Sequence, residues 1–440
     1  MKIYIETLGC PKNEVDSENA AGILETAGHV LVNDPEEAEA ILVNTCAFIN
    51  DAKEESIDRI FDMAAYKENG ALLMVSGCLS QRYGEKLAQL IPEADIFLGV
   101  NDYKKLPEIL AAHEEDKQEV YQSACSMLYE EPGARKAKIE KGSAYLRIAE
   151  GCDNHCAYCV IPSIRGGYRS RSEEAILAEA KELVAAGAKE IIMVAQDVTA
   201  YGIDLYKEFR LPKLLEKLCE IDGLRWIRLM YCYEDRISDE LIRVMGANPK
   251  ICPYIDMPIQ HASDPVLKGM GRRSTRASIE NTLARLRSGV PGIHIRTTLI
   301  TGFPGEKMEH FHDLESFVEE QRFERLGVFA YSKEEGTPAA SMKGQVRQQT
   351  KENRRELLMA IQQEISLEHN EEKVGREFEV LVEGLEVDGR YTGRTPYDAP
   401  EIDNQVLFPC DEELEPGDFV KVRITEALDY DLLGEFVCRL

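Results

Sequence analysis

The chain has 440 residues, of which 79 are acidic and 52 basic, so its formal net charge at pH 7 is −27. This length suits two or three domains rather than one, and such acidity excludes a general attraction to nucleic acid while favouring a basic partner. No apolar run approaches the roughly 18 residues of a membrane span, and the amino terminus lacks the apolar core of a secretion signal. We therefore expect a cytoplasmic protein that contacts no membrane.

Residues 1–100 alternate short apolar segments with helical patterns. Strands are predicted at "KIYIET", "AILVNT", "ALLMVSG" and "DIFLG", and helices at 14–27, 50–69 and 82–90. This alternation is typical of a doubly wound, parallel α/β sheet. Ligands of open α/β sheets collect at the carboxyl ends of the strands. We therefore expect Cys10, Cys46 and Cys78, which follow three of these strands, to lie on one rim.

The charge-rich composition of 101–140 predicts a linker. Within this stretch we set the end of the amino-terminal domain at residue 125 and assign 126–140 as the linker between the two domains. A second alternation then occupies 141–345, with strands at "AYLRIAE", "KEIIMVA", "LRWIRLM", "YIDM", "IHIRTTLI" and "RLGVFAY". Six such units predict an open, partial β/α barrel. As in closed barrels, residues just after the strands are expected to face the active site.

Residues 346–375 are predicted to form a long charged helix with Leu357, Ile361 and Ile365 along one apolar stripe. From Arg376 the pattern becomes all-β. Five short strands separated by Gly, Pro and Asp predict a small closed barrel of the OB kind over 376–440.

The segment 376–440 is itself strongly acidic, with 17 acidic and 6 basic residues and a net charge of −11. A tRNA-binding module needs a basic groove, so this composition disfavours tRNA and suits a basic protein as the docking partner. The alternative is a solvated acidic surface that aids solubility without any partner.

Twelve cysteines are many for a reducing compartment, where clustered cysteines are first interpreted as metal ligands or catalytic groups. Cys152, Cys156 and Cys159 follow Cys-x3-Cys-x2-Cys in "EGCDNHCAYCVIP", which is too tight for independent core residues. A zinc site would need His155, which sits between two ligands on a short loop, as its fourth ligand. A 4Fe-4S cluster with thiolates on three irons leaves the fourth iron open to a small molecule. The spacing favours the cluster over zinc or a chance group of buried cysteines.

This spacing, in a loop after the predicted strand "AYLRIAE", resembles the radical S-adenosylmethionine (SAM) superfamily. The resemblance implies that the amine and carboxylate of SAM chelate the open iron. It also implies that an electron from the cluster cleaves the sulfonium and yields a 5′-deoxyadenosyl radical. Such chemistry suits an unactivated C–H bond, which acid–base catalysis does not open.

The first three cysteines lie in "LGCPKNEVDSE", "VNTCAFINDAKEES" and "GCLSQRY". Taken alone, they are compatible with ordinary buried cysteines. Together with the partial barrel and the terminal β-barrel, these segments resemble the methylthiotransferase family over nearly the whole chain. The resemblance implies that Cys10, Cys46 and Cys78 hold a second 4Fe-4S cluster whose unclaimed iron carries the sulfur to be inserted. The terminal module of that family is called TRAM.

Several segments, among them "GCPKN", "GCDNHCAYCVIPSIRGGYRSR" and "YIDMPIQHAS", resemble the branch that modifies an aspartate of small-subunit ribosomal protein S-twelve. The tRNA-modifying branch, the MiaB type, typically has Gln-Met-Asn after its first cysteine, where this chain has Pro11, Lys12 and Asn13. One position departs from the pattern: relatives often place a proline after Tyr-x-Tyr, where this chain has Glu234.

The resemblance implies an enzyme that inserts a methylthio group at the β-carbon of that aspartate, using two 4Fe-4S clusters and two SAM molecules with different fates. It also implies an electron donor such as flavodoxin or ferredoxin. The nearest alternative is the same chemistry on a tRNA adenosine. A non-catalytic iron–sulfur protein and a ribosome-binding module are alternatives from other functional classes.

Residues that follow the barrel strands or the cluster loop complete the expected site. Glycines permit close approach of the backbone to the adenosyl group, and arginines hold carboxylates. The alternatives are an ordinary turn for the glycines, a solvated arginine loop and a core histidine. The expected SAM-binding residues are Tyr158, Gln196, Asp197, Gly302 and Gly305, and the expected substrate-binding residues are Arg165, Arg169, Arg171, Tyr231 and His261.

Overall fold

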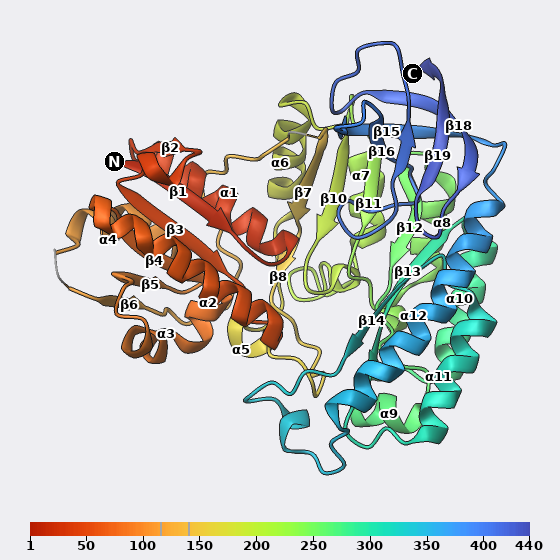
Figure 1. The fold of residues 1–440 in the computed structure, drawn as a ribbon, viewed down its shortest axis with the longest axis horizontal. Helices are drawn as coiled ribbons and strands as arrows, with labels where there is room; N and C mark the ends of the chain where they lie inside the picture. The colour runs from red at the N-terminus through yellow and green to blue at the C-terminus, as the bar shows by residue number, and fades with distance from the viewer. Residues whose placement is uncertain (115–116, 140) are drawn as a thin grey trace. The chain divides into compact units, whose positions relative to one another are not determined.

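The computed structural model describes residues 1–114, 117–139 and 141–440; residues 115, 116 and 140, which fall within the expected linker, lie outside the description. The chain divides into two compact units (Figure 1). The first comprises Met1–Lys138, Ala149–Arg171 and Glu334–Thr337, and the second comprises Ile139–Ile148, Ser172–Lys333 and Pro338–Leu440. Across the described ranges, no helix combines the length and apolar character needed to cross a membrane.

The first unit is built on a six-stranded parallel sheet in the order β2-β1-β3-β4-β5-β6. Residues of β3 alternate between its two faces, so that Ile41 and Val43 enter one apolar core while Ala40 and Leu42 enter the other. Burial of both faces confirms the doubly wound fold. Its strands are β1 (Lys2–Thr7), β2 (Val30–Val32), β3 (Ala40–Thr45), β4 (Leu72–Gly77), β5 (Ile96–Leu98) and β6 (Glu119–Tyr121), and its helices are α1 (Pro11–Thr26), α2 (Asn50–Ala64), α3 (Cys78–Leu90) and α4 (Leu106–Ala112).

The expectation of a linker across 101–140 was wrong for its first part. Helix α4 packs on the sheet, with Leu106 and Ile109 in the core, and β6 adds the last strand by parallel pairing with β5. Strand β6 has only three residues, "EVY", and all of them are half-buried. No apolar run marks so short an edge strand, because most of its stabilisation comes from its pairing with β5.

The second unit contains six parallel strands in the order β14-β13-β12-β11-β10-β7. Neighbours in the sheet follow one another in the chain, and the sheet does not close on itself, which confirms the open barrel. The strands are β7 (Ser143–Arg147), β10 (Glu190–Val194), β11 (Trp226–Leu229), β12 (Ile251–Asp256), β13 (His294–Thr301) and β14 (Arg325–Ala330). The helices are α6 (Glu173–Ala185), α7 (Leu211–Cys219), α8 (Asp239–Ala247), α9 (Asp264–Gly269), α10 (Arg276–Gly289), α11 (Met308–Gln321) and α12 (Gln348–Glu371).

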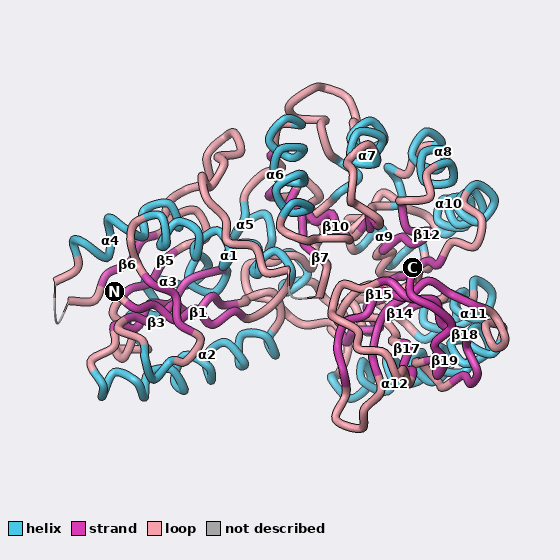
Figure 2. Tube along the Cα trace, turned by 90° about the horizontal axis from the view of Figure 1, so that it is seen from above, coloured by secondary structure: helices cyan, strands magenta, loops and turns pink. Residues whose placement is uncertain are grey.

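The chain ends in a closed five-stranded barrel in the order β15-β16-β17-β19-β18, as the sequence predicts. Figure 2 shows its strands as one group near α12. Alternate residues such as Val380 and Val382 of β15 and Val420 and Val422 of β18 fill its interior. The strands are β15 (Glu377–Leu385), β16 (Tyr391–Arg394), β17 (Val406–Phe408), β18 (Phe419–Ala427) and β19 (Leu432–Arg439).

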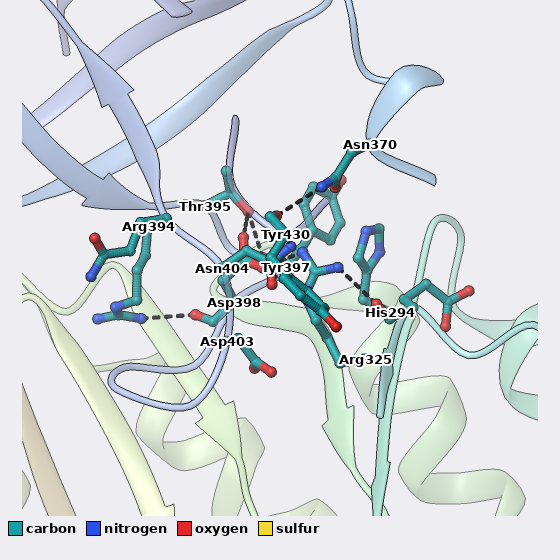
Figure 3. Close-up of polar contacts among 12 residues, drawn as sticks. His294, Arg325, Asn370, Arg394, Thr395, Tyr397, Asp398, Asp403, Asn404 and Tyr430 are labelled. Carbon is teal, nitrogen blue, oxygen red and sulfur yellow. Dashed lines mark hydrogen bonds and ion pairs between the residues drawn. The ribbon is translucent and has the colours of Figure 1, made fainter. Parts of the chain in front are cut away.

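Helix α12 confirms the long helix expected over 346–375, but its expected apolar stripe was wrong in part: Ile365 is buried, whereas Leu357 is not. Leu357 is 52% exposed, whereas the neighbouring Leu358 is fully buried. The buried face is rich in polar residues because their side chains bond to groups on neighbouring elements. Lys351 donates to the Tyr331 carbonyl at 2.7 Å, and Asn370 donates to the Tyr430 carbonyl at 2.7 Å (Figure 3).

The closed barrel contacts the amino-terminal ends of the open barrel's strands. Arg394 of β16 donates to Glu190 at 2.6 Å and to the Ser143 hydroxyl at 3.1 Å, and these are the first residues of β10 and β7. At β14, Asp398 accepts from Arg325 at 2.5 Å (Figure 3). These buried pairs attach the closed barrel to both edge strands of the open one.

Aromatic stacking extends this contact. The ring of His294, the first residue of β13, lies 4.2 Å from that of Tyr397 (Figure 3). Trp226, the first residue of β11, meets Phe419 of β18 edge-on at 4.8 Å. The closed barrel therefore covers the end of the open barrel opposite to the carboxyl rim where the site is expected.

Neighbouring cations stabilise two of the buried carboxylates in this contact as anions. Burial alone would raise the pKa of Glu190, but the guanidinium groups of Arg394 and Arg228 outweigh it and lower the pKa to about 2. In the same way, Arg325 and Lys373 overcome burial and lower the pKa of Asp398 to about 2. Both carboxylates therefore stay ionised inside the protein.

We expect Glu190→Gln to lower the free energy of unfolding by about 3–5 kcal/mol, because it leaves the buried guanidinium of Arg228 without its anion and leaves Arg394 with Glu383 alone. Denaturant unfolding followed by fluorescence of Trp226, the chain's single tryptophan, measures the change. Asp239→Asn, which removes a 91% exposed carboxylate from an ion pair with Arg285, is the matched control. Equal midpoints for the two variants would show that the buried ion pairs of Glu190 add no stability beyond that of an exposed pair.

Candidate active site

Three thiols meet at one rim of the first sheet. Cys10 precedes α1 just after β1, Cys46 directly follows β3, and Cys78 directly follows β4 as the first residue of α3. Strands β1, β3 and β4 are parallel neighbours, so their carboxyl ends lie side by side. Cys46 and Cys78 are buried and Cys10 is half-buried.

Short contacts show how close these thiols are. Asn13 of α1 accepts through Oδ1 from the thiols of Cys10 at 3.6 Å and Cys78 at 3.9 Å. Gly9 has φ +97°, and a Cβ there would lie 2.8 Å from the Cys46 Cβ, so the close approach requires glycine. Burial, with Cys78 and Cys10 as neighbours, raises the pKa of Cys46 to about 12.

The second cysteine triad occupies a loop between β8 (Ala149–Glu150) and α5 (Ile161–Arg165). The Asn154 N–H donates to the Cys152 sulfur at 3.4 Å, and the Ile161 N–H donates to the Cys159 sulfur at 3.5 Å. Burial raises the pKa of Cys159 to about 12; the Ile161 N–H opposes this rise, and Cys156 and Cys152 add to it.

A pair of short strands closes the base of this loop. Strand β8 pairs antiparallel with β9 (Arg169–Ser170), and the Cys152 N–H donates to the Gly166 carbonyl at 3.1 Å. Gly151 has φ +82°, and a Cβ there would lie 2.0 Å from the Gly167 carbonyl oxygen. Only glycine fits at this point, which fixes the direction in which the chain enters the triad.

Each triad fits three corners of a 4Fe-4S cluster by its donor chemistry. Both provide three thiols, and N–H groups donate to sulfur in the second triad, as is common around cluster ligands. Within the described ranges, no three His, Cys, Asp or Glu side chains are arranged to hold a single metal ion. His155, the alternative zinc ligand, is exposed.

Arg165, expected to bind substrate, ends α5 and is only 3% exposed. Its guanidinium lies 2.7 Å from Asp16 and 3.5 Å from Glu150. It also donates to Asn13 Oδ1 at 3.2 Å and to the Cys78 sulfur at 3.3 Å. The structure thus directs this side chain to the first triad.

The other two expected substrate arginines hold the segment that follows Cys125. Arg169 donates to the Ser126 carbonyl at 3.2 Å and to the Arg165 carbonyl at 3.0 Å. Arg171 forms a bidentate pair with Glu131 at 2.9 and 2.7 Å. These contacts order the chain beside the second triad.

Glu334, from the short segment after β14 that belongs to the first unit, lies near the first triad. Its carboxylate is 2% exposed and pairs with Lys53 at 2.8 Å and Arg82 at 2.9 Å. Arg82 in turn donates to the carbonyl of Ala47, the residue after Cys46, at 3.0 Å. This chain of contacts holds the Cys46 turn in place.

In the second unit, the residues expected at the carboxyl rim follow their strands as predicted. Gln196 and Asp197 come after β10, and Gln196 is half-buried. Asp197 is fully buried, accepts from the Thr199 hydroxyl at 2.6 Å and pairs with Arg236. Asp197 therefore shapes the turn after β10.

Tyr231, which follows β11, has the left-handed φ of +58°. Such strain in a non-glycine residue persists only where its surroundings enforce it. The Tyr231 N–H donates to Asp256 Oδ2 at 3.0 Å, and Asp256 Oδ1 accepts from Arg296 at 3.0 Å. Arg296 lies 3.4 Å from Asp403 of the closed barrel. The terminal module thus reaches the rim at Tyr231 through the side chains of Asp403, Arg296 and Asp256.

His261, after β12, is fully buried in a polar network. Its Nδ1 accepts from the N–H groups of Ala262 at 3.0 Å and Ser263 at 2.9 Å, which places the ring proton on Nε2. That nitrogen lies 3.4 Å from Glu306 Oε2. Glu306 also accepts from the Gly302 N–H at 2.8 Å, so His261 supports the turn after β13.

The two glycines of that turn face different surroundings. A Cβ at Gly302 would lie 2.2 Å from Cγ of Lys351 on α12, so glycine is needed there to admit the helix. A Cβ at Gly305 would meet no atom within 4 Å.

Tyr158, in the cysteine loop of the first unit, is half-buried.

Sequence reasoning does not point to Asn13, Asp16 or Glu334, although all three support the triads. For Asn13 a signal exists, because Cys10-x2-Asn13 spans the first turn of a helix and brings the two side chains together. Asp16 and Glu334 take their roles only from contacts distant in sequence.

Three family models match the chain. They are described as uncharacterized protein family UPF0004 at residues 2–99, the radical SAM superfamily at 146–318, and the TRAM domain at 374–437.

Curated relatives match over the full length. The ribosomal protein uS12 methylthiotransferase RimO of Desulforamulus reducens is 49% identical, with 98% of this chain and 99% of the relative covered. That of Clostridioides difficile is 48% identical, with both chains covered completely. The chain belongs to the RimO family. This confirms the methylthiotransferase resemblance and its branch.

Solved structures share the fold at much lower identity. TsrM of Kitasatospora setae, a radical SAM methyltransferase, superposes with a TM-score of 0.55 at 12% identity, covering 77% of this chain and 73% of that chain. The cobalamin-dependent radical SAM enzyme OxsB gives a TM-score of 0.55 at 14% identity, covering 83% and 56%. At such identities the likeness shows the fold alone.

In the metal-free protein, we expect iodoacetamide at pH 8 to modify Cys438 many times faster than Cys46. Cys438 is exposed, whereas burial and neighbouring thiols raise the pKa of Cys46 to about 12, which leaves little reactive thiolate. Mass spectrometry of digested samples over time measures both rates. Comparable rates at the two sites would show that the first triad is open to solvent.

Proposed function

We propose that this chain inserts a methylthio group at the β-carbon of an aspartate of ribosomal protein uS12, the small-subunit protein expected from the sequence. The observation that carries the proposal is 48–49% identity over the full chain to relatives named as uS12 methylthiotransferases. The two cysteine triads support it, because sulfur insertion needs both a radical source and a place for sulfur. With 4Fe-4S clusters bound, the second triad would supply reductive cleavage of SAM and the first would hold the sulfur to be inserted.

We assign the two cluster sites to Cys10, Cys46 and Cys78, and to Cys152, Cys156 and Cys159. Individual donors in both triads oppose the rise in thiol pKa that burial causes: the Arg165 guanidinium donates to the Cys78 sulfur, and backbone N–H groups donate to Cys152 and Cys159. Hydrogen bonds from cations or N–H groups stabilise the negative charge that ligation requires.

We propose that Tyr158, Gln196 and Gly305 contact SAM, and that Asp197 and Gly302 shape its site through Arg236 and Lys351. For the substrate, we propose that Tyr231 contacts the target and that His261 supports the rim through Glu306. Arg169 and Arg171 hold the segment that follows Cys125, through Ser126 and Glu131. The strained backbone of Tyr231 supports its role, since such strain concentrates at functional positions.

The charge of the terminal module supports a basic protein as the partner. Residues 376–440 carry a net charge of −11, which suits docking to a basic ribosomal protein and opposes tRNA. We propose that the enzyme acts in the cytoplasm on uS12, within the small ribosomal subunit, and takes electrons from a small carrier such as flavodoxin or ferredoxin.

Offering the reconstituted, reduced enzyme uS12 and tRNA in parallel tests this proposal. We expect mass spectrometry to detect a methylthio group on an aspartate of uS12, and 5′-deoxyadenosine to form. Cys156→Ala abolishes both products, because it removes a ligand of the second triad. Methylthiolation of tRNA alone would overturn the choice of substrate. Absence of 5′-deoxyadenosine would favour a non-catalytic iron–sulfur protein.

A further inference from the structure

One buried cation joins the two triad-bearing segments of the first unit. Arg165 lies six residues after Cys159 in sequence, yet its guanidinium donates to the sulfur of Cys78 at 3.3 Å. It also donates to Asn13 Oδ1 at 3.2 Å, the same oxygen that accepts from the thiols of Cys10 and Cys78. Arg165, which follows the second triad in the chain, therefore contacts a cysteine of the first triad.

Two carboxylates fix the orientation of this guanidinium. Asp16 of α1 lies 2.7 Å away and Glu150, just before the second triad, lies 3.5 Å away; the side chains of all three residues are at most 8% exposed. A buried arginine is costly unless it is paired. The planar guanidinium has enough donors to meet these carboxylates and still reach Asn13 and Cys78.

Apolar packing fixes the helix that carries Arg165. Val160 and Ile164 enter the same core as Ile60, Val75 and Leu79 of the first sheet and its helices. Gly166 follows Arg165 with φ +75° and turns the chain back towards β9. Helix α5 is therefore held against the first sheet, and the guanidinium has a defined place beside Cys78.

We propose that Arg165 is a positioning residue that fixes the position of the two triads relative to each other. It also raises the reduction potential of a cluster bound at Cys10, Cys46 and Cys78. The proposal rests on the two-cluster function above. Reduction adds a negative charge to a cluster, and hydrogen bonds to its sulfurs and nearby charge set its potential. A buried cation that donates to a ligand thiolate favours the reduced state. No other role of Arg165, such as binding the carboxylate of a ligand, is needed to explain its contacts.

The test isolates the first cluster. In a full-length chain carrying Cys152→Ala, Cys156→Ala and Cys159→Ala, only the first triad remains to bind iron. Arg165→Lys keeps the charge but loses the planar fork, and Arg165→Gln loses both. We expect the midpoint potential, measured by electron paramagnetic resonance during a redox titration, to shift to more negative values in Arg165→Gln and less far in Arg165→Lys.

Arg135→Gln is the matched control, because Arg135 is a half-buried arginine of the first unit that pairs with the buried carboxylate of Glu18. It should leave the potential unchanged. Retained iron in Arg165→Lys with loss of iron in Arg165→Gln also supports the proposal when circular dichroism shows both chains folded. Unchanged potentials in both Arg165 variants, or unfolding of both, would overturn it. Absence of iron from the parent background would instead contradict the two-cluster function, and this proposal with it.

Discussion

The parallel pairing of β1, β3 and β4 is the constraint on which the first cysteine site depends. Residues 10, 46 and 78 are far apart in the chain, and no local motif brings them together. Their strands end on one rim because parallel neighbours share a direction. Two glycines complete the arrangement: Gly9 lets the backbone pass the Cys46 side chain, and Gly77 has φ +93° immediately before Cys78. The sheet thus brings together three cysteines that are distant in the chain, whereas the three cysteines of the second triad lie within eight consecutive residues.

The second unit uses buried charge for a different purpose. Replacing buried ion pairs by apolar residues is often neutral or stabilising, so the pairs of Glu190, Arg394, Arg325 and Asp398 are better explained by orientation than by stability. They fix the closed barrel on the starts of the open barrel's strands. From there Asp403 reaches Arg296, Asp256 and finally the backbone of Tyr231. The module expected to dock the substrate protein is therefore linked to the rim where the substrate is expected to react.

Sequence patterns predicted the three folds because each depends on local periodicity and strand–helix order. They also predicted that the six cysteines form two groups of three, since the spacing in the loop and the positions at strand ends carry that information. They did not predict β6, whose three residues depend on pairing with β5, or the buried face of α12, where Lys351 and Asn370 bond to carbonyl groups. The contact of Arg165 with Cys78 depends on the packing of α5 against the first sheet, which no spacing in the sequence encodes.

The central claim is that six thiolates in two separate triads hold two clusters. Iron and sulfide per chain after anaerobic reconstitution test it most directly, in the parent, Cys10→Ala, Cys156→Ala and the control Cys219→Ala, whose cysteine lies on α7 outside both triads. We expect two 4Fe-4S clusters in the parent and the control, and one in each triad variant. Full iron content in Cys10→Ala, or loss of both clusters from the control, would contradict it.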